Sequence, residues 1–279
     1  MKLDDRKNAS SEKIDGVGPA RGVLKISEPP RGQFQHWRLA APATIAPLVQ
    51  HIWMVRWNLD EGASHVARTL PYPNVHIVVE DDQAQIHGIN RGRFTRELKG
   101  KGSAIGVKFR PGGFYPFLKK SVSTLRNRAV TLESVVGEST RDFCRELAMV
   151  DIDENALLGC IESFLLRHWP DVDPNVDRVA ALVAAIEADR TILRVEDLVA
   201  RYALTKRSLQ RLFEHYVGIG PKWVINRFRM HEAVERLKLA EPVDWAAFAL
   251  ELGYFDQAHF NRDFKALIGC TPRRYADSA

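Results

Sequence analysis

The sequence predicts an α+β fold, with an N-terminal antiparallel β-barrel-like domain with flanking helices and an all-α C-terminal domain. Short apolar runs rich in aromatic and β-branched residues, separated by turn residues, fill much of the first half of the chain. From Thr131 onward the apolar residues recur with the period of helices. The last third contains one helical segment twice, beginning at Thr205 and again 51 residues later at Asp256.

Length and composition agree with two domains and set few limits on function. The chain has 279 residues, 45% of them hydrophobic, and a formal net charge of +5. This mildly basic balance permits a polyanionic partner without requiring one. Residues 180–279 hold 15 Lys and Arg against 13 Asp and Glu, so the case for nucleic acid depends on where the charges lie.

The cysteines and the apolar segments indicate a cytoplasmic protein without a membrane span. Cys144, Cys160 and Cys270 are scattered, so reduced and unreactive thiols are expected. No apolar run reaches the roughly 18 residues that a transmembrane helix needs. The polar start of the chain lacks the apolar core of a signal peptide, and residues 1–30 are expected to form a disordered arm.

Residues 31–170 are predicted to form the β-rich domain with trailing helices. Turn residues recur between its apolar runs at intervals of about 8–12 residues, which favours an antiparallel barrel or sandwich. Strands are expected at residues 51–59, 74–80, 84–89 and 103–109, and helices around Phe143 and Leu147 and at residues 155–169. The prolines within residues 169–175 mark the boundary to the all-α domain, residues 177–279.

A proline- and glycine-bearing turn follows the last expected strand, with Arg110 at its corner. Arg110 and free backbone N–H groups of the turn could hold a small anion. A structural salt bridge is the commoner role for an arginine in such a turn. Both interpretations remain open at the level of the sequence.

Each copy of the repeated segment predicts a helix-turn-helix unit. Thr205 and Asp256 are N-cap residues, whose side-chain oxygens accept a first-turn backbone N–H. A short amphipathic helix precedes each copy, at residues 195–203 and 244–252. The apolar residues that must face a core are Leu209, Leu212 and Phe213 in the first copy and Phe260, Phe264 and Leu267 in the second.

The polar faces that remain suit double-stranded DNA, because Arg and Gln match guanine and adenine edges and Lys or Arg neutralises phosphate. Residues 221–239 between the copies contain no internal Pro or Gly. Nineteen residues of helix span roughly 28 Å, near the roughly 34 Å between successive major-groove faces. The predicted DNA-binding residues are Lys206, Arg207, Gln210 and Arg211 in the first copy and Gln257, His259, Asn261 and Arg262 in the second.

Other functions are compatible with parts of the sequence. A helical bundle with a charged, solvated face would explain either copy alone, but not the duplication with its caps and spacer. A metal-dependent barrel enzyme fused to a DNA-binding domain is the main rival, since His76 and Glu80 would share one strand face. A cysteine nucleophile is disfavoured because no cysteine has an electropositive setting. A regulator without a small ligand also remains open, and a ligand-sized cavity lined by Trp53, Trp57 or Phe109 would argue against it.

Residues 179–275 resemble the AraC/XylS family of transcription regulators. The resemblance implies two helix-turn-helix units, base contacts by Arg207, Gln210 and Arg211 and by Gln257, His259 and Asn261, and a phosphate or bracing role for Arg262. RNA polymerase is an expected partner and no cofactor is expected. An activator is the expected type of regulator, although the sequence leaves activation and repression both open. Ala203 departs from the family, in which a Gly is usual at this turn. The motif residues are Thr205, Leu209, Arg211, Phe213, Gly218, Arg229, Met230, Ala233, Gly253, Tyr254, Asp256, Phe260, Arg262, Phe264, Lys265, Gly269, Thr271, Pro272 and Tyr275.

The N-terminal half, residues 33–147, is similar to the barrel-type sensors of some of these regulators, especially at the turn that follows Phe109. That resemblance implies binding of a small-molecule effector or formation of a homodimer. Residues expected to contact such a ligand are Arg110, His76, Glu80 and Trp53.

Overall fold

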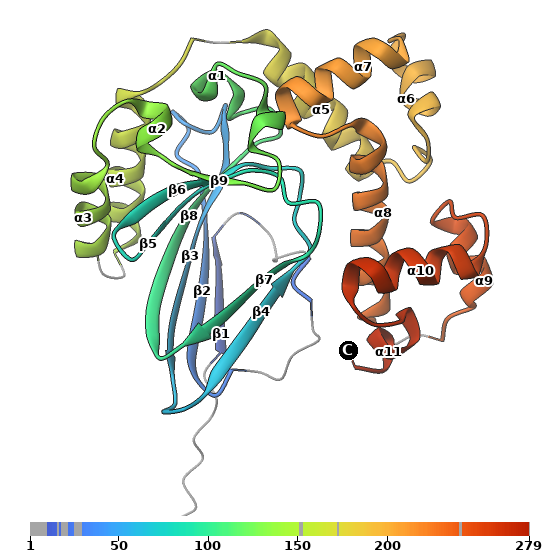
Figure 1. The fold of residues 1–279 in the computed structure, drawn as a ribbon, viewed down its shortest axis with the longest axis horizontal. Coiled ribbons are helices and arrows are strands. Elements are labelled where there is room, and N and C mark those ends of the chain that lie inside the picture. The colour runs from blue at the N-terminus through green and yellow to red at the C-terminus, as the bar shows by residue number, and fades with distance from the viewer. Residues whose placement is uncertain are drawn as a thin grey trace, which may run out of the picture.

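The computed structural model describes residues 10–15, 17, 22–24, 30–150, 153–171, 173–239 and 242–278. A curved β-sheet forms the N-terminal half, and helices occupy its sides and the C-terminal half (Figure 1). Most of the expected disordered arm, residues 1–30, lies outside the described residues. Within it, β1 (Ser10–Asp15) is a strand where little order was expected, and it pairs in parallel with the edge strand β2. Such edge pairing uses backbone groups, which every sequence supplies.

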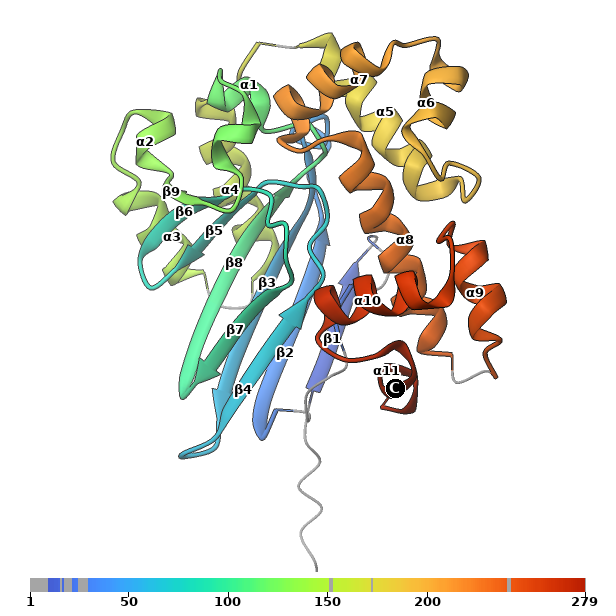
Figure 2. The same ribbon diagram turned by 45° about the vertical axis from the view of Figure 1, so that its right-hand side comes forward.

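The main sheet has seven strands in the order β1-β2-β3-β8-β5-β6-β9, antiparallel except at the β1–β2 pair. It stays open, so the predicted barrel-like domain is confirmed without a closed barrel. A separate pair, β4 and β7, lies beside the long strands (Figure 2). The strands after β1 are β2 (Gly32–Ala40), β3 (Val49–Leu59), β4 (Ser64–Thr69), β5 (His76–Glu80), β6 (Gln83–His87), β7 (Phe94–Lys99), β8 (Lys101–Phe109) and β9 (Ala129–Thr131).

The two faces of the sheet differ in chemistry because successive side chains of a strand point to opposite sides. On one face Ile52, Val107 and Ile77 lie in register and are buried in the main core. On the other face the same three strands place His51, Lys108 and His76 in register. The sheet therefore carries an apolar face under helices and a polar face rich in histidine.

The helices follow the predicted periods closely. The stretch expected at residues 155–169 forms α4, and α5 begins directly after the proline-rich boundary, with Asp173 as its N-cap. The helices are α1 (Tyr115–Leu118), α2 (Glu133–Val136), α3 (Arg141–Met149), α4 (Glu154–Arg167), α5 (Pro174–Ala188), α6 (Val195–Tyr202), α7 (Lys206–Leu212), α8 (Pro221–Leu237), α9 (Trp245–Glu251), α10 (Gln257–Ile268) and α11 (Pro272–Asp277), with a 3-10 turn η1 (Val122–Leu125) and a π-helical turn η2 (Phe213–Val217).

The hydrophobic core does not divide at the domain boundary predicted within residues 169–175. One cluster runs from Ile52 in the sheet through Val179 of α5 to Leu198 and Phe213 of the first helix-turn-helix unit. A second, separate cluster packs α9, α10 and α11 around Phe264 against the end of α8, and it also includes Leu24 and Leu70 of the N-terminal half. The first unit thus shares the main core with the β domain, whereas the second unit packs in this smaller cluster.

Candidate nucleic-acid interface

Both predicted N-caps form, and they fix the start of each reader helix. The Thr205 Oγ1 accepts a hydrogen bond from the Ser208 backbone N–H at 3.1 Å. The Asp256 Oδ1 accepts one from the His259 backbone N–H at 2.6 Å. Each cap satisfies a donor that the first helical turn leaves unpaired, so α7 and α10 begin where the repeat predicts.

The buried skeleton of the repeat also forms. The side chains of Leu209, Phe213, Phe260 and Phe264 are all fully buried. The C-terminal ends match as well, because Gly218 and Gly269 both take left-handed backbone conformations, with φ of 91° and 98°. The other two predicted stripe residues, Leu212 and Leu267, are half-buried.

The two units differ at their turns. Ala203 adopts the left-handed conformation with φ of 50° and ψ of 39°, two residues before the cap of α7. In the second unit the left-handed residue is Gly253, with φ of 74°, three residues before the cap of α10. The first unit therefore has a shorter turn and places an alanine where glycine has no steric cost.

They differ again at the ends of the reader helices. After Leu212 the first reader continues as the π-helical turn η2, closed by a 2.9 Å hydrogen bond from the Gly218 N–H to the Phe213 carbonyl. The second reader stays α-helical to Ile268. Such π turns are rare and often occur at functional sites.

Helix α8 joins the units, with α6 and α7 near its start and α9 to α11 near its end (Figures 1 and 2). It contains 17 residues, two fewer than expected, and spans about 25 Å at about 1.5 Å per residue. Pro221 occupies its first turn, as predicted.

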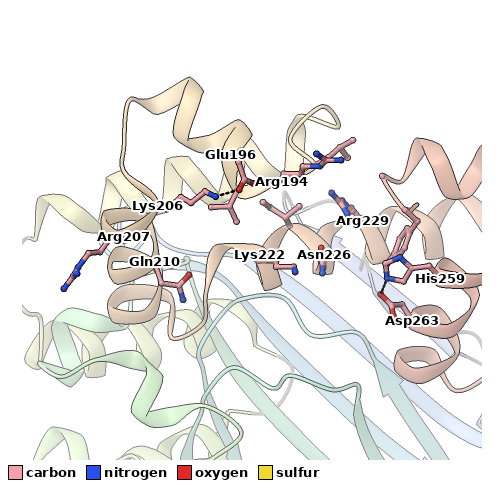
Figure 3. Close-up of a pocket in the computed structure, with 15 residues that line it drawn as sticks. Arg194, Glu196, Lys206, Arg207, Gln210, Lys222, Asn226, Arg229, His259 and Asp263 are labelled. Atoms are coloured by element: carbon pink, nitrogen blue, oxygen red, sulfur yellow. Dashed lines mark ion pairs between the residues drawn. The ribbon is translucent and has the colours of Figure 1, made fainter. Parts of the chain in front are cut away.

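A groove of about 910 Å³ lies between the two units, with α8 along its base (Figure 3). Five basic and two acidic side chains line it, so the lining is positive. The charged residues are Arg194, Lys206, Arg207, Lys222, Arg229, Glu196 and Asp263, and the other lining residues are Leu193, Val195, Gln210, Ile225, Asn226, Gly253, Tyr254 and His259.

The groove includes half of the predicted DNA-binding residues. Lys206, Arg207, Gln210 and His259 line it. Arg211, Gln257 and Arg262 are exposed and Asn261 is half-buried, and these four lie outside its lining.

The groove also contains basic and polar residues of α8 and of the start of α6, which were not predicted from the sequence. Lys222, Asn226 and Arg229 follow at i, i+4 and i+7 along α8, which places them on one helix face. That spacing was readable in the sequence. The position of Arg194 before α6 offered no such signal.

Some predicted readers already have protein partners. Lys206 pairs with Glu196, and His259 Nε2 lies 3.5 Å from an Asp263 oxygen. Gln210 Nε2 donates to Glu214 Oε1 at 3.2 Å.

Three arginines on the reader helices differ from these paired residues. Within the described ranges, Arg207, Arg211 and Arg262 make no hydrogen bond or ion pair. All three are exposed. A bracing role for Arg262 therefore finds no protein partner, and its cation is available to a polyanion.

The predicted ligand residues separate into two places. Trp53, His76 and Glu80 project from the polar face of the sheet, where Trp53 Nε1 donates to His76 Nδ1 at 3.3 Å and Glu80 pairs with Arg96 at 2.5 Å. Arg110 lies elsewhere.

The surroundings of Arg110 match the structural interpretation. Its Nη1 donates to the Pro47 carbonyl at 3.2 Å and lies 3.8 Å from the Asp177 carboxylate on α5. The guanidinium thus links the turn after β8 to the start of α5.

The most buried polar residues of the sheet's polar face are Lys108 and His51. Neither was predicted from the sequence as a ligand residue. Lys108 is 9% exposed, and burial, followed by the nearby charge of Arg38, lowers its pKa from 10.5 to about 7. Burial and the charge of Lys108 lower the pKa of His51 to about 2. The charge of Glu187 acts in the opposite direction on Lys108 and is the smallest of these contributions to its pKa.

The Lys108 ammonium also contacts the DNA-binding half of the chain through an aromatic ring. Its Nζ lies 4.2 Å from the ring centroid of Tyr72, whose ring lies 4.1 Å from that of His231 on α8. His231 is 4% exposed, and neither ring nitrogen has a hydrogen-bond partner of good geometry among the described residues.

The three cysteines are free, and burial raises the pKa of each thiol. The pKa of Cys160 rises to about 12, with a further contribution from Glu146. Raised pKa values disfavour the reactive thiolate. In the part of the chain that the structure describes, no cluster of three or more His, Cys, Asp or Glu side chains is placed to hold a metal ion. None of the helices described there has an apolar stretch of the length that a membrane span requires.

Comparison with known proteins identifies the C-terminal domain. Residues 198–278 match a helix-turn-helix domain, and residues 38–131 match a domain of unknown function, DUF6597. The C-terminal domain is of the AraC type, which confirms the resemblance drawn from the sequence.

The curated relatives are similar over limited lengths. An uncharacterized HTH-type transcriptional regulator of Haemophilus influenzae is 28% identical over 98 residues, 35% of this chain and 33% of the relative. The putative HTH-type transcriptional regulator YkgA of Escherichia coli is 29% identical over 83 residues, 30% of this chain and 34% of the relative. MtrA of Neisseria gonorrhoeae, an HTH-type transcriptional regulator, is 24% identical over 133 residues, 43% of this chain and 44% of the relative. The chain thus spans a third to less than half of the length of these relatives.

Among solved structures, the apo form of a ToxT point variant from Vibrio cholerae is similar with a TM-score of 0.42 and 11% identity, over 81% of this chain and 97% of that chain.

Proposed function

We propose that the chain is a sequence-specific DNA-binding transcriptional regulator whose two helix-turn-helix units read adjacent major grooves. One observation carries the proposal: both reader helices border a single positively charged groove, and arginines on both have no protein partner among the described residues. Unpaired arginines on reader helices are suited to guanine edges and phosphates. Helix α8, about 25 Å long, sets the distance between the units.

The proposed site is asymmetric. At the repeat offset, Arg207 corresponds to Ala258 and Gln210 corresponds to Asn261. The buried skeleton positions both helices alike, but the side chains that face the bases differ. One copy of the chain should therefore prefer two different half-sites.

We also propose that the polar face of the N-terminal sheet holds a small-molecule effector with a negatively charged group. Support comes from the buried Lys108 beside His51, His76 and Trp53. No Asp or Glu is among the buried residues of the described ranges, and the charge of Glu187 offsets only part of the effect of burial on Lys108. A carboxylate or phosphate there would raise the pKa of Lys108 and favour its charged form. The contact of Lys108 with Tyr72 offers a route from this face to α8.

The rival enzyme function has less support, because the two residues it needs are otherwise engaged. His76 accepts a hydrogen bond from Trp53, and Glu80 pairs with Arg96. Under the proposal the protein acts in the cytoplasm without catalysis, and RNA polymerase and a second copy of the chain are its proposed protein partners.

The test uses the full chain, because the first unit shares its core with the β domain. Selection of bound duplexes from a random pool should recover two dissimilar half-sites. Affinity for the selected duplex should fall steeply as salt rises, since bound cations release counterions from DNA. Binding that is absent at low salt, or insensitive to salt, would refute the proposal.

A further inference from the structure

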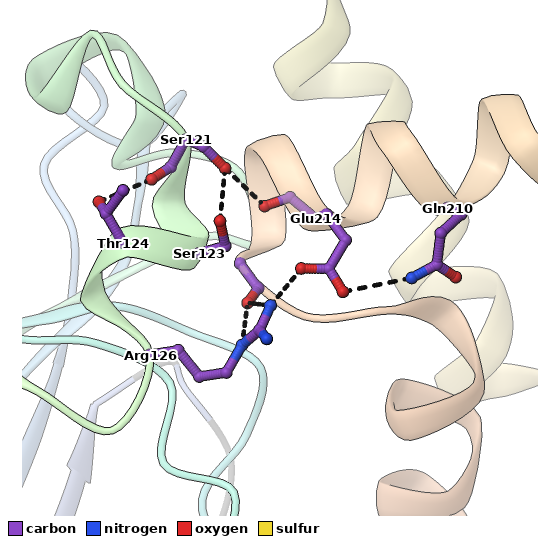
Figure 4. Close-up of polar contacts among 7 residues, drawn as sticks. Ser121, Ser123, Thr124, Arg126, Gln210 and Glu214 are labelled. Atoms are coloured by element: carbon purple, nitrogen blue, oxygen red, sulfur yellow. Dashed lines mark hydrogen bonds and ion pairs between the residues drawn. The ribbon is translucent and has the colours of Figure 1, made fainter.

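The N-terminal domain donates hydrogen bonds to the C-terminal end of the first reader helix (Figure 4). Arg126 donates from Nε and Nη2 to the Gly218 carbonyl at 2.9 and 2.8 Å. Ser121 Oγ donates to the Glu214 carbonyl at 3.1 Å. These donors satisfy the Glu214 carbonyl within the π-helical turn η2 and the Gly218 carbonyl directly after it, and a cation at this helix end is also favoured by the helix dipole.

The contact is close packed as well as polar. Val122 is fully buried, and its carbonyl oxygen would lie 2.9 Å from a Cβ added at Gly218. No larger residue fits at Gly218 without moving this segment. The segment from Ser121 to Arg126 therefore packs directly against the C-terminal end of the reader helix.

These contacts extend to Gln210, whose side chain is predicted to read bases. The Arg126 guanidinium pairs with Glu214 Oε2, and the other carboxylate oxygen of Glu214 accepts from Gln210 Nε2 at 3.2 Å. Glu214 lies one helical turn after Gln210, so the two face the same side. One carboxylate thus joins an arginine of the β domain to a reader of the DNA-binding domain.

This arrangement fixes which end of the Gln210 amide faces the groove. An ionised carboxylate accepts hydrogen bonds only, so the amide NH₂ must face Glu214 and a flipped amide would set two oxygens against each other. Glutamine reads adenine through both ends of the amide, so its orientation decides which base edge it matches.

We propose that Arg126 is a positioning residue for base readout, which orients Gln210 through Glu214 and lets the N-terminal domain set the base preference of the first unit. The inference rests on the proposed DNA-binding function. It requires no direct contact between Arg126 and DNA.

The second unit provides a matched control. Arg93 of the β domain donates from Nη1 to the Ile268 carbonyl at the end of α10, at 2.7 Å. This contact also joins an arginine of the N-terminal domain to the end of a reader helix. This hydrogen bond goes to a backbone carbonyl of the second unit, so Arg93→Ala should leave the base preference of the first unit unchanged.

The experiment measures the affinity of the full chain for its selected duplex and for duplexes with each base pair of the first half-site replaced in turn. Arg126→Ala should lower the discrimination at the base read by Gln210 by about threefold to tenfold, which lies in the lower part of the range of coupling between contacting residues. Arg126→Lys should restore part of it, and Glu214→Ala should reproduce the loss. In a Gln210→Ala background, Arg126→Ala should have no further effect.

Additive effects of Arg126→Ala and Gln210→Ala would overturn the inference, and so would unchanged base preference in a folded Arg126→Ala protein. If Arg126→Ala fails to fold, Glu214→Ala decides by the same criteria. If the wild type binds specifically but the effects of Arg126→Ala and Gln210→Ala add, only the positioning role of Arg126 is refuted. Absence of specific binding by the wild type refutes the DNA-binding function and this inference together.

Discussion

Replacing Phe264 by alanine should unfold the second helix-turn-helix unit while the rest of the chain stays folded. The Phe264 side chain is fully buried, and its ring lies 5.6 Å from that of Phe260 and 5.8 Å from that of Tyr275. Removing a buried phenylalanine costs about 3–5 kcal/mol, because it loses transfer free energy and leaves a cavity. The small cluster around α9 to α11 offers little else to compensate.

The matched variant is Phe213→Ala in the first unit. Its side chain is equally buried and holds the corresponding place in the repeat, but it belongs to the core that extends into the sheet. A similar loss of free energy should therefore lower the unfolding temperature of the β domain and the first unit together.

Backbone hydrogen exchange measured peptide by peptide separates these outcomes. Phe264→Ala should lose protection in α10 and α11 and keep it in β3, β8 and α7. Phe213→Ala should weaken protection in the sheet as well as in α7. Equal loss throughout the chain for Phe264→Ala, or no loss at all, would refute the division into two cores.

Three other single substitutions have expected outcomes. Ala203→Gly should raise the free energy of unfolding by about 0.5–1 kcal/mol in denaturant titration, because glycine removes the strain of the left-handed conformation at some cost in chain entropy; a decrease would contradict it. Since burial lowers the pKa of Lys108 from 10.5 to about 7, the unfolded chain binds more protons in that window, so stability should rise from pH 7 towards pH 10.5 and Lys108→Met should flatten the rise; an equal slope in both proteins would disprove this. Arg211→Ala should weaken specific DNA binding by about 1–3 kcal/mol at an unchanged melting temperature, and undiminished affinity for every sequence would show that α7 is not a reader.

The features that could be predicted from the sequence are those that depend on local side-chain chemistry and on a regular period of apolar residues. The caps at Thr205 and Asp256, the buried stripe and the glycine–proline helix ends all recur at one offset, so a single chain reveals them without homologues. The strands of the sheet were predictable for the same reason, because aromatic and β-branched runs alternate with turns.

Features that depend on packing between distant segments could not be predicted. Strand β1 has no strand-like composition and pairs only because β2 presents an open edge. The π-helical turn after Leu212 has no sequence signature, although Ser121 supports it from 93 positions away in the chain. The link from Arg126 to Gln210 likewise appears only once the β domain and the reader helix are packed together.

The candidate site was partly accessible to sequence reasoning. Lys206, Arg207, Gln210 and His259 were predicted and line the groove, whereas Arg194 and the polar stripe of α8 were missed. From the sequence, helix α8 is predicted only as a spacer between the units. The polar period of Lys222, Asn226 and Arg229 is nevertheless present in the sequence.

The central claim is that two unlike helix-turn-helix units read adjacent major grooves on one side of the duplex. Hydroxyl-radical footprinting of the full chain on its selected duplex tests this most directly. The account predicts two protected patches on one face of the DNA, about 10–10.5 base pairs apart, with different base sequences in the two half-sites. A single protected patch, or two patches on opposite faces of the duplex, would contradict it.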